Sequence, residues 1–188
     1  MCVVEGDFET LGGQLLIASP ALRDPNFVRT VVLVTEHTPD GAMGFVLNRP
    51  TPIAVSDALP HLGELAGSDA FVYVGGPVQP ESAMALAELE DVGNAAAIAF
   101  GDVGFLEPDA DPAELADGVL RLRIFAGYAG WGAGQLESEL EEEAWILESA
   151  EPDDVFSPVP DDLWSSVLTR KGGSYAVVAR MPLDPSVN

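Results

Sequence analysis

Residues 13–50 hold three short apolar runs separated by turn-forming residues, and this pattern constrains the fold more than any other in the chain. The middle run, residues 30–35, reads TVVLVT and is apolar at successive positions rather than at alternate ones. A strand of this kind is usually covered on both faces. Asp40 and Gly41 then form a pair typical of tight hairpins. We therefore predict a hairpin whose second arm is residues 42–47, with Gly44 marking a bulge or a close approach of backbone.

The rest of the chain carries short strands and helices without a fixed-period repeat or a dividing linker. Strands are predicted at residues 14–18, 71–74, 95–100, 103–106, 119–125, 144–147 and 175–179. Helices are predicted at residues 53–65, from Asp111 onward, at 135–143 and at 161–171, whereas residues 81–90 fit either state. Because strands come in runs with helices inserted irregularly, we expect a single α+β domain over residues 1–188, with residues 1–12 as a loose N-terminal lead-in.

The charge balance restricts the partners. Eight basic and 31 acidic residues give a net charge of −23. Such a chain is repelled by phosphate backbones and anionic lipid surfaces, so direct nucleic-acid binding and membrane binding are disfavoured. The single cysteine, Cys2, excludes an internal disulfide. The first twenty residues contain no base, unlike a secretory leader. We expect a cytoplasmic protein, and the oligomeric state is left open.

The familiar catalytic signatures are missing from the sequence. No serine lies in a Gly-x-Ser-x-Gly elbow, no Gly-Lys-Ser/Thr step is present, and the two histidines, His37 and His61, belong to no metal-binding motif. Residues 127–134 (GYAGWGAG) resemble a dinucleotide fingerprint, but their glycine spacing is wrong. We interpret them as a tight strand-to-helix turn around a packed Trp131, with a ligand-binding loop as the alternative. The sequence therefore predicts no cofactor and no metal, and it favours a non-catalytic protein.

The best candidate site lies in the least negative part of the chain. Residues 1–50 have a net charge of −3 and the remainder −20. Arginine suits recognition of carboxylate or phosphate groups. The candidate ligand-binding residues are Arg23, Asn26, Arg29, Asn48, Arg49, Gly130 and Trp131. They form one site if the 24–29 turn, the 48–49 strand end and the 127–134 loop converge. Alternatively, the arginines pair with nearby acids or loop carbonyls and hold the turns in place.

Five segments resemble one known family. They are LLIASPALRDPNFVRTVVLVTEH at residues 15–37, GAMGFVLNRP at 41–50, VGGPV at 74–78, FAGYAGWGAGQLE at 125–137 and the helix start at 161–163. In this order they closely resemble the YqgE/AlgH family of bacterial proteins. The resemblance implies a single α+β domain with a mixed, barrel-like sheet and flanking helices. It implies no reaction and no catalytic residue, because the family is functionally uncharacterised, and the label of transcriptional regulator on AlgH comes from a regulatory phenotype.

Three functions follow as hypotheses. The first is a cytoplasmic binding or regulatory module that acts through a protein partner or a small anionic ligand. The second is a small enzyme of unknown reaction that uses Asn48, Arg49, His37 and an acid such as Asp24. The third, a direct DNA-binding regulator, is disfavoured by the net charge of −23.

Overall fold

One ten-stranded sheet dominates the computed structural model, which describes residues 8–107 and 109–183. Its strands are β1 (Gln14–Ala18), β2 (Val31–Thr38), β3 (Gly41–Val46), β4 (Pro50–Ala54), β5 (Phe71–Val74), β6 (Val78–Leu89), β7 (Ala97–Phe100), β8 (Val103–Phe105), β9 (Val119–Gly132) and β10 (Trp145–Ser149). Hydrogen-bonded neighbours follow the order β10-β1-β2-β3-β9-β6-β8-β7, and the β4–β5 pair joins through β5. Among the described strands, β5 and β9 run parallel and the other pairs are antiparallel. The sheet is therefore mixed, as expected.

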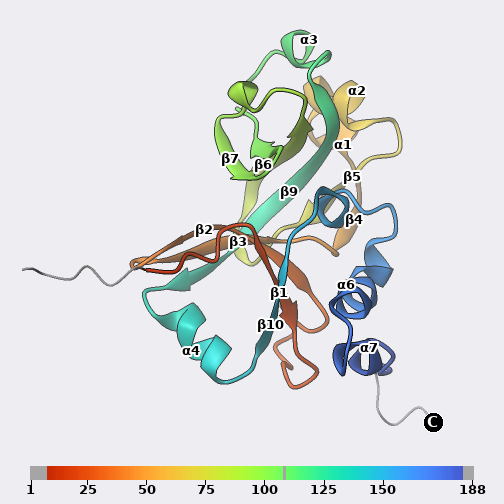
Figure 1. Ribbon diagram of the computed structural model, residues 1–188. Coiled ribbons are helices and arrows are strands. Elements are labelled where there is room, and N and C mark those ends of the chain that lie inside the picture. The colour runs from red at the N-terminus through yellow and green to blue at the C-terminus, as the bar shows by residue number, and fades with distance from the viewer. Residues whose placement is uncertain (1–7, 108, 184–188) are drawn as a thin grey trace, which may run out of the picture.

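Strand β9 connects the two parts of the molecule. Its last residues pair with β3, whereas its first residues pair with β6. Figure 1 shows β9 running diagonally from the part that contains β6, β7 and β8 to the part that contains β1, β2, β3 and β10. Strand β5 lies against the middle of β9, where Tyr73 pairs with Phe125 and Val74 with Ala126. Any site beside the centre of β9 is therefore walled by segments from both parts.

Helices cover both parts of the sheet. They are α1 (Val55–Ala58), α2 (Gly63–Ala66), α3 (Pro112–Leu115), α4 (Gln135–Glu141), α5 (Pro152–Val155), α6 (Leu163–Lys171) and α7 (Tyr175–Val178), with 3₁₀ turns at Pro60–Leu62, Val92–Asn94 and Pro160–Asp162. The predicted start of α3 is confirmed, because the Asp111 side chain accepts a hydrogen bond from the Ala113 N–H at 2.9 Å. Helix α6 buries Trp164, whose Nε1 donates to the Ala18 carbonyl at 2.9 Å. This contact joins the last long helix to β1.

The expected hairpin is present as β2 and β3. Val31, Val32, Leu33 and Val34 are fully buried, which confirms a strand covered on both faces. A register shift interrupts the pairing between Val34 and Glu36, opposite Gly44. A Cβ on Gly44 would also meet the Leu33 carbonyl and the Val32 side chain. The glycine therefore allows both the bulge and the close approach that the sequence suggested.

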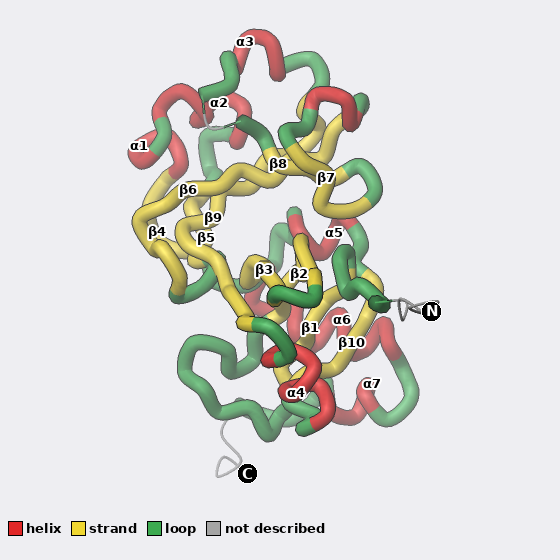
Figure 2. Tube along the Cα trace, turned by 90° about the vertical axis from the view of Figure 1, so that its left-hand side faces the viewer, coloured by secondary structure: helices red, strands yellow, loops and turns green. Residues whose placement is uncertain are grey.

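The described sheet does not close into a barrel, which corrects the barrel-like expectation. β10 and β7 are its two ends, and no hydrogen-bonded pairing between them is present in the described residues. Figures 1 and 2 show these strands in different parts of the molecule. β7 instead comes close to β2. Phe100 of β7 also lies beside Gly13, the residue before β1.

The glycine-dense segment forms a strand and not a loop. β9 continues through Gly132, so most of the expected strand-to-helix turn is paired sheet. Gly127 has a φ of 70°, and a Cβ there would lie 2.6 Å from the Gly76 carbonyl oxygen. Glycine is needed at position 127 because residues 75–78 cross over β9 with the two backbones in direct contact. The sequence around Gly127 gives no sign of this crossing. Residues 81–90, which fitted either state, belong to β6.

Residues 175–179 were predicted as a strand, and this prediction was wrong. Gly172 and Gly173 have φ of 77° and 58° and turn the chain back along α6, where residues 175–178 form α7. Tyr175 and Val178 pack on the main hydrophobic cluster. A four-residue apolar run such as residues 175–178 is compatible with either a buried helix or a strand. Here the run forms a helix that packs against α6.

The expected N-terminal lead-in is described only in part. Residues 1–7 lie outside the described residues, and residues 8–12 form no helix or strand. They run beside β2, where the Leu11 N–H donates to His37 Nδ1 at 3.0 Å. Within residues 8–107 and 109–183, no helix has the length and apolar character needed to cross a membrane.

Candidate functional site

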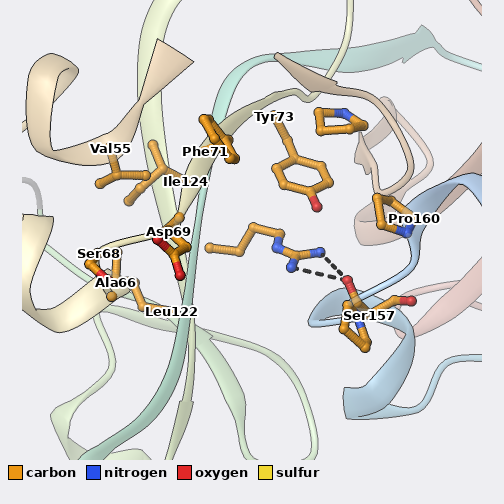
Figure 3. A pocket seen from close by; sticks show the side chains of 15 residues that line it. Val55, Ala66, Ser68, Asp69, Phe71, Tyr73, Leu122, Ile124, Ser157 and Pro160 are labelled. Atoms are coloured by element: carbon orange, nitrogen blue, oxygen red, sulfur yellow. Dashed lines mark hydrogen bonds between the residues drawn. The ribbon is translucent and has the colours of Figure 1, made fainter. Parts of the chain in front are cut away.

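The strongest candidate site is built around Arg123 in the first half of β9. Residues 119–125 alternate so that Arg121 and Arg123 project from the same face of the strand as Phe125. Arg123 is partly buried because the Tyr73 side chain of β5 and the loop after α5 cover it. Its guanidinium lies over the Tyr73 ring, with Cζ 4.2 Å from the ring centroid. Both Nη atoms donate to the Ser157 carbonyl oxygen at 3.1 Å (Figure 3, dashed lines).

Arg123 is partly buried and has no acidic partner, a combination that Arg29 and Arg49 share among the described arginines. Among the described residues no carboxylate forms an ion pair with it, although the chain contains 31 acids. Arg121, two residues away on the same face, binds Glu88 at 2.6 Å and Asp153 at 2.7 Å. A partly buried charge is usually paired because its desolvation is costly. Arg123 therefore keeps a positive charge and donor capacity that the protein itself does not neutralise.

Burial also shifts the pKa values of Arg123 and Tyr73. Desolvation lowers the pKa of Arg123, which the neighbouring Arg121 lowers further. Desolvation raises the pKa of Tyr73 above its usual 10.0, partly opposed by the Arg123 charge. The guanidinium nevertheless remains charged at neutral pH, because arginine side chains are not deprotonated in proteins. The Tyr73 hydroxyl stays protonated and can donate a hydrogen bond.

Arg123 lines a cleft of about 610 Å³. The cleft opens beside the start of β5, where Leu122, Arg123 and Ile124 of β9 line it in succession. Figure 3 shows Asp69 and Ser68 on one wall, and Ser157 and Pro160 on the other. This volume falls within the usual range of small-molecule sites. The cleft thus offers one cation, one carboxylate and the aromatic rings of Phe71 and Tyr73 to a ligand.

The residues predicted from the sequence are distributed over three places. The 24–29 turn and the 48–49 strand end do meet. Arg49 donates to the carbonyls of Pro25 at 3.3 Å and Val28 at 3.0 Å. Arg49 and Asn26 also line a small cavity of about 70 Å³. Asn48 accepts from the Val31 N–H at 3.0 Å and donates to the Arg29 carbonyl at 2.9 Å. These contacts brace the turn.

Arg23 and Arg29 lie in a different cavity of about 390 Å³. Arg29 has a φ of 58° and donates to the carbonyls of Met181 and Pro182 at 2.6 and 2.7 Å. Its guanidinium lies 4.0 Å from the Trp164 ring centroid, and burial lowers its pKa. Ser19 also lines this cavity, and its buried Oγ has no hydrogen-bond partner among the described residues.

Gly130 and Trp131 do not share a cavity with these arginines. Gly130 pairs with Met43 in the sheet. Trp131 is buried in a hydrophobic cluster, stacks on Phe27 at 6.3 Å and donates to Glu139 at 2.9 Å. The 24–29 turn therefore reaches Trp131 only through the Phe27 ring.

His37 lies far from Asn48 and Arg49. It follows Val31 by six residues along β2, a separation of about 20 Å. Its Nε2 lies 2.8 Å from Glu137 Oε1, while Nδ1 accepts from Leu11. The pKa of Glu137 is lowered by a backbone hydrogen bond and by the His37 ring. The enzyme hypothesis required these side chains in one pocket, and the structure separates them. Residues 8–107 and 109–183 contain no group of His, Cys, Asp and Glu arranged to hold a metal ion.

Comparison with known proteins identifies the same family from the sequence and from the fold. The AlgH-like family model matches residues 15–176. The chain belongs to the AlgH-like family. UPF0301 proteins from Streptomyces coelicolor and Thermobifida fusca are 48% and 42% identical to it, covering 97% and 95% of this chain and 97% and 96% of their own.

Two solved structures of bacterial proteins share this architecture. Protein DIP2367 from Corynebacterium diphtheriae superposes with a TM-score of 0.86 at 27% identity, over 93% of this chain and 94% of its own. The AlgH protein from Pseudomonas aeruginosa gives 0.71 at 29% identity, over 96% and 98%. The YqgE/AlgH resemblance is thereby confirmed, and like its relatives this chain belongs to an uncharacterised family.

Sequence reasoning missed Arg123 as a site residue. The 119–125 strand was correctly predicted, but Arg121 and Arg123 looked equivalent in its alternating pattern. Only their long-range partners differ, since Glu88 and Asp153 approach Arg121 and the Ser157 carbonyl approaches Arg123. The available signal was an arginine within an apolar strand of a chain with few bases.

Proposed function

We propose that this AlgH-like protein is a non-catalytic module that binds a small organic anion, a carboxylate or a phosphate, in the Arg123 cleft. The observation that carries the proposal is the partly buried guanidinium without a carboxylate partner, in the wall of a cleft of about 610 Å³. Arginine presents planar, paired N–H donors that match carboxylate and phosphate oxygens. Direct DNA contact is not part of the proposal, because the chain carries a net charge of −23.

The carboxylate of Asp69, the second charged group in the cleft, narrows the class of ligand that we propose. Asp69 lies on the cleft wall and forms no ion pair with a described residue. A ligand with an ammonium or hydroxyl group at its other end satisfies this carboxylate while its anionic end meets Arg123. The apolar surface of Phe71 and Ile124 supports a short carbon skeleton between the two ends. The proposed location is the cytoplasm, which the single cysteine supports.

Calorimetric titration tests the proposal with acetate, glycine, inorganic phosphate, glycerol 3-phosphate and neutral acetamide as probes. We expect at least one anion to bind wild type and acetamide not to bind. Arg123→Met should weaken that anion by about 10- to 150-fold, the equivalent of a charged hydrogen bond of about 1.5–3 kcal/mol. Arg121→Met is the matched control on the same strand face. Its own ligands are Glu88 and Asp153, so it should leave anion binding unchanged.

Two further variants separate charge from geometry. Arg123→Lys keeps the charge but loses the planar pair of donors, so its affinity should fall between wild type and Arg123→Met. Asp69→Asn should weaken glycine and leave acetate unaffected. Equal binding of any responsive anion to Arg123→Met and wild type, both shown to be folded by circular dichroism, would refute the assignment.

A second candidate is the cavity of Arg23 and Arg29, favoured by the unpartnered Ser19 hydroxyl. Two arginines and a hydroxyl suit a phosphate group. In the same titrations, Arg23→Met and not Arg123→Met should then abolish phosphate binding. Arg23 is the better probe of this cavity because it is exposed, whereas Arg29 also braces the C-terminal segment.

A further inference from the structure

A second concavity of about 350 Å³ lies between the two parts of the sheet. It is lined from one part by Glu36 of β2 and Met43 of β3, and from the other by residues of β6, β7 and the end of β8. Leu59 and Leu62, which follow α1, close one wall. It shares no lining residue with the Arg123 cleft. It is therefore a separate place in the fold, and its occupancy does not depend on the proposed function.

The lining is apolar except at two positions. Met43, Met84, Phe105 and Leu106 face the space together with several alanines. Methionine adapts its shape to different apolar ligands, so such a surface accepts a hydrocarbon or aromatic group without strict complementarity. Met43, Met84 and Phe105 are only partly buried, which leaves their side chains available for contact. Burial of a ligand's apolar part would stabilise a complex by about 25 cal/mol for each Å² removed from water.

The two polar positions are both glutamates. Glu36 and Glu107 are exposed, and neither forms an ion pair with any described residue. No lysine or arginine lines this concavity. The carboxylates thus add a local negative potential to that of a chain with a net charge of −23. A low-dielectric apolar wall strengthens such a field and attracts cations toward the concavity.

We propose that this concavity binds a small amphipathic amine, with the ammonium group at Glu36 and Glu107 and the apolar body against Met43, Met84 and Phe105. Charge complementarity selects this ligand class. A fatty acid of the same size would place its carboxylate against two glutamates, and a second copy of this chain would bring a further 23 negative charges. A neutral apolar molecule would fit the wall and leave the carboxylates without a partner. The amine alone satisfies both parts of the lining.

A series with one carbon chain and three head groups tests the ligand class. Hexylammonium, 1-hexanol and hexanoate are titrated by calorimetry, with methylammonium as a probe of charge without an apolar body. We expect hexylammonium to bind more tightly than hexanol, and hexanoate and methylammonium to bind much more weakly. Glu36→Gln with Glu107→Gln should lower hexylammonium affinity by about 2- to 30-fold, as expected for two surface ion pairs, and leave hexanol unchanged. Added NaCl should weaken the amine and not the alcohol.

A matched pair of substitutions on β7 tests the location. Ala97 is exposed and lines the concavity, whereas Ile98 is exposed and does not line it. Ala97→Phe should fill the space and weaken hexylammonium at least tenfold, while Ile98→Phe should leave it unchanged. Arg123→Met should also have no effect on the amine, so failure of the Arg123 proposal and failure of this one are distinguishable. Hexanoate binding as tightly as hexylammonium, amine binding matched by methylammonium, or equal amine binding by the two phenylalanine variants would each overturn the proposal.

Discussion

Asn48 is expected to stabilise the protein through backbone contacts alone, and its removal should be costly. The side chain joins two segments by accepting from the Val31 N–H at 3.0 Å and donating to the Arg29 carbonyl at 2.9 Å. Val31 is fully buried, so its N–H finds no water when the amide is lost. Each unsatisfied buried group costs about 1–3 kcal/mol. Because Val31 is fully buried and Arg29 only partly, we expect Asn48→Ala to lower the free energy of unfolding by about 2–4 kcal/mol, less than the full cost of two buried groups.

The measurement is chemical denaturation followed by tryptophan fluorescence, with a thermal scan as a second readout. For a chain of this size, 2–4 kcal/mol corresponds to a fall in Tm of roughly 4–16 °C. Asn26→Ala is the matched control, because the Asn26 side chain is exposed and makes no hydrogen bond to a described residue. It should change the free energy of unfolding by less than about 0.5 kcal/mol. Equal stability of the Asn48→Ala and Asn26→Ala proteins would refute the reasoning.

Asn48→Asp sharpens the same test. An aspartate can still accept from Val31, but it places a second oxygen against the Arg29 carbonyl, where the amide donated. It should therefore be at least as unstable as Asn48→Ala at pH 7, although it retains one hydrogen bond. Protonation restores a donor, so the deficit relative to wild type should shrink as the pH falls. A deficit that stays constant with pH would contradict the proposed geometry.

Three further predictions concern the backbone crossing and two titrating groups. A Cβ on Gly75 would collide with the Gly127 carbonyl, so Gly75→Ala should destabilise the protein by about 3 kcal/mol in denaturation, and an unchanged midpoint would contradict the crossing. Burial raises the pKa of Tyr73, so an ultraviolet titration should show a phenol step above pH 10.0 that is missing from Tyr73→Phe. The stability that comes from the protonated Tyr73 hydroxyl should be present below pH 10.0 and lost as the pH rises through the raised pKa. A backbone hydrogen bond and the His37 ring lower the pKa of Glu137. The difference in unfolding free energy between wild type and Glu137→Gln should therefore be present above pH 4.5 and disappear as the pH falls through the lowered pKa. A difference that persists in acid would count against the contact between Glu137 and His37.

Local patterns predicted the β-hairpin well. The non-alternating run at residues 30–35 indicated a strand buried on both faces, and it became β2. The Asp40-Gly41 turn and Gly44 set the hairpin and its irregular register. These features depend on residues close together in the chain, where side-chain period and turn chemistry act directly.

Local patterns failed where tertiary contacts determined the conformation. Gly127 looked like a loop glycine, yet it serves a backbone crossing with residues 75–78. Residues 175–178 looked like a strand, yet packing on α6 made them a helix. In both cases the local sequence permitted two states, and tertiary contacts, with residues 75–78 for Gly127 and with the neighbouring α6 for residues 175–178, selected one.

The candidate site shows the same division. The sequence by itself determined that this chain is acidic, short of bases and able to form an alternating strand carrying Arg121 and Arg123. Only the tertiary structure decided that Arg121 meets Glu88 and Asp153, while Arg123 meets a carbonyl oxygen and an open cleft. The reason is physical: whether a charge is neutralised depends on which side chains approach within a few ångströms, and residues 30 or more positions away supply them.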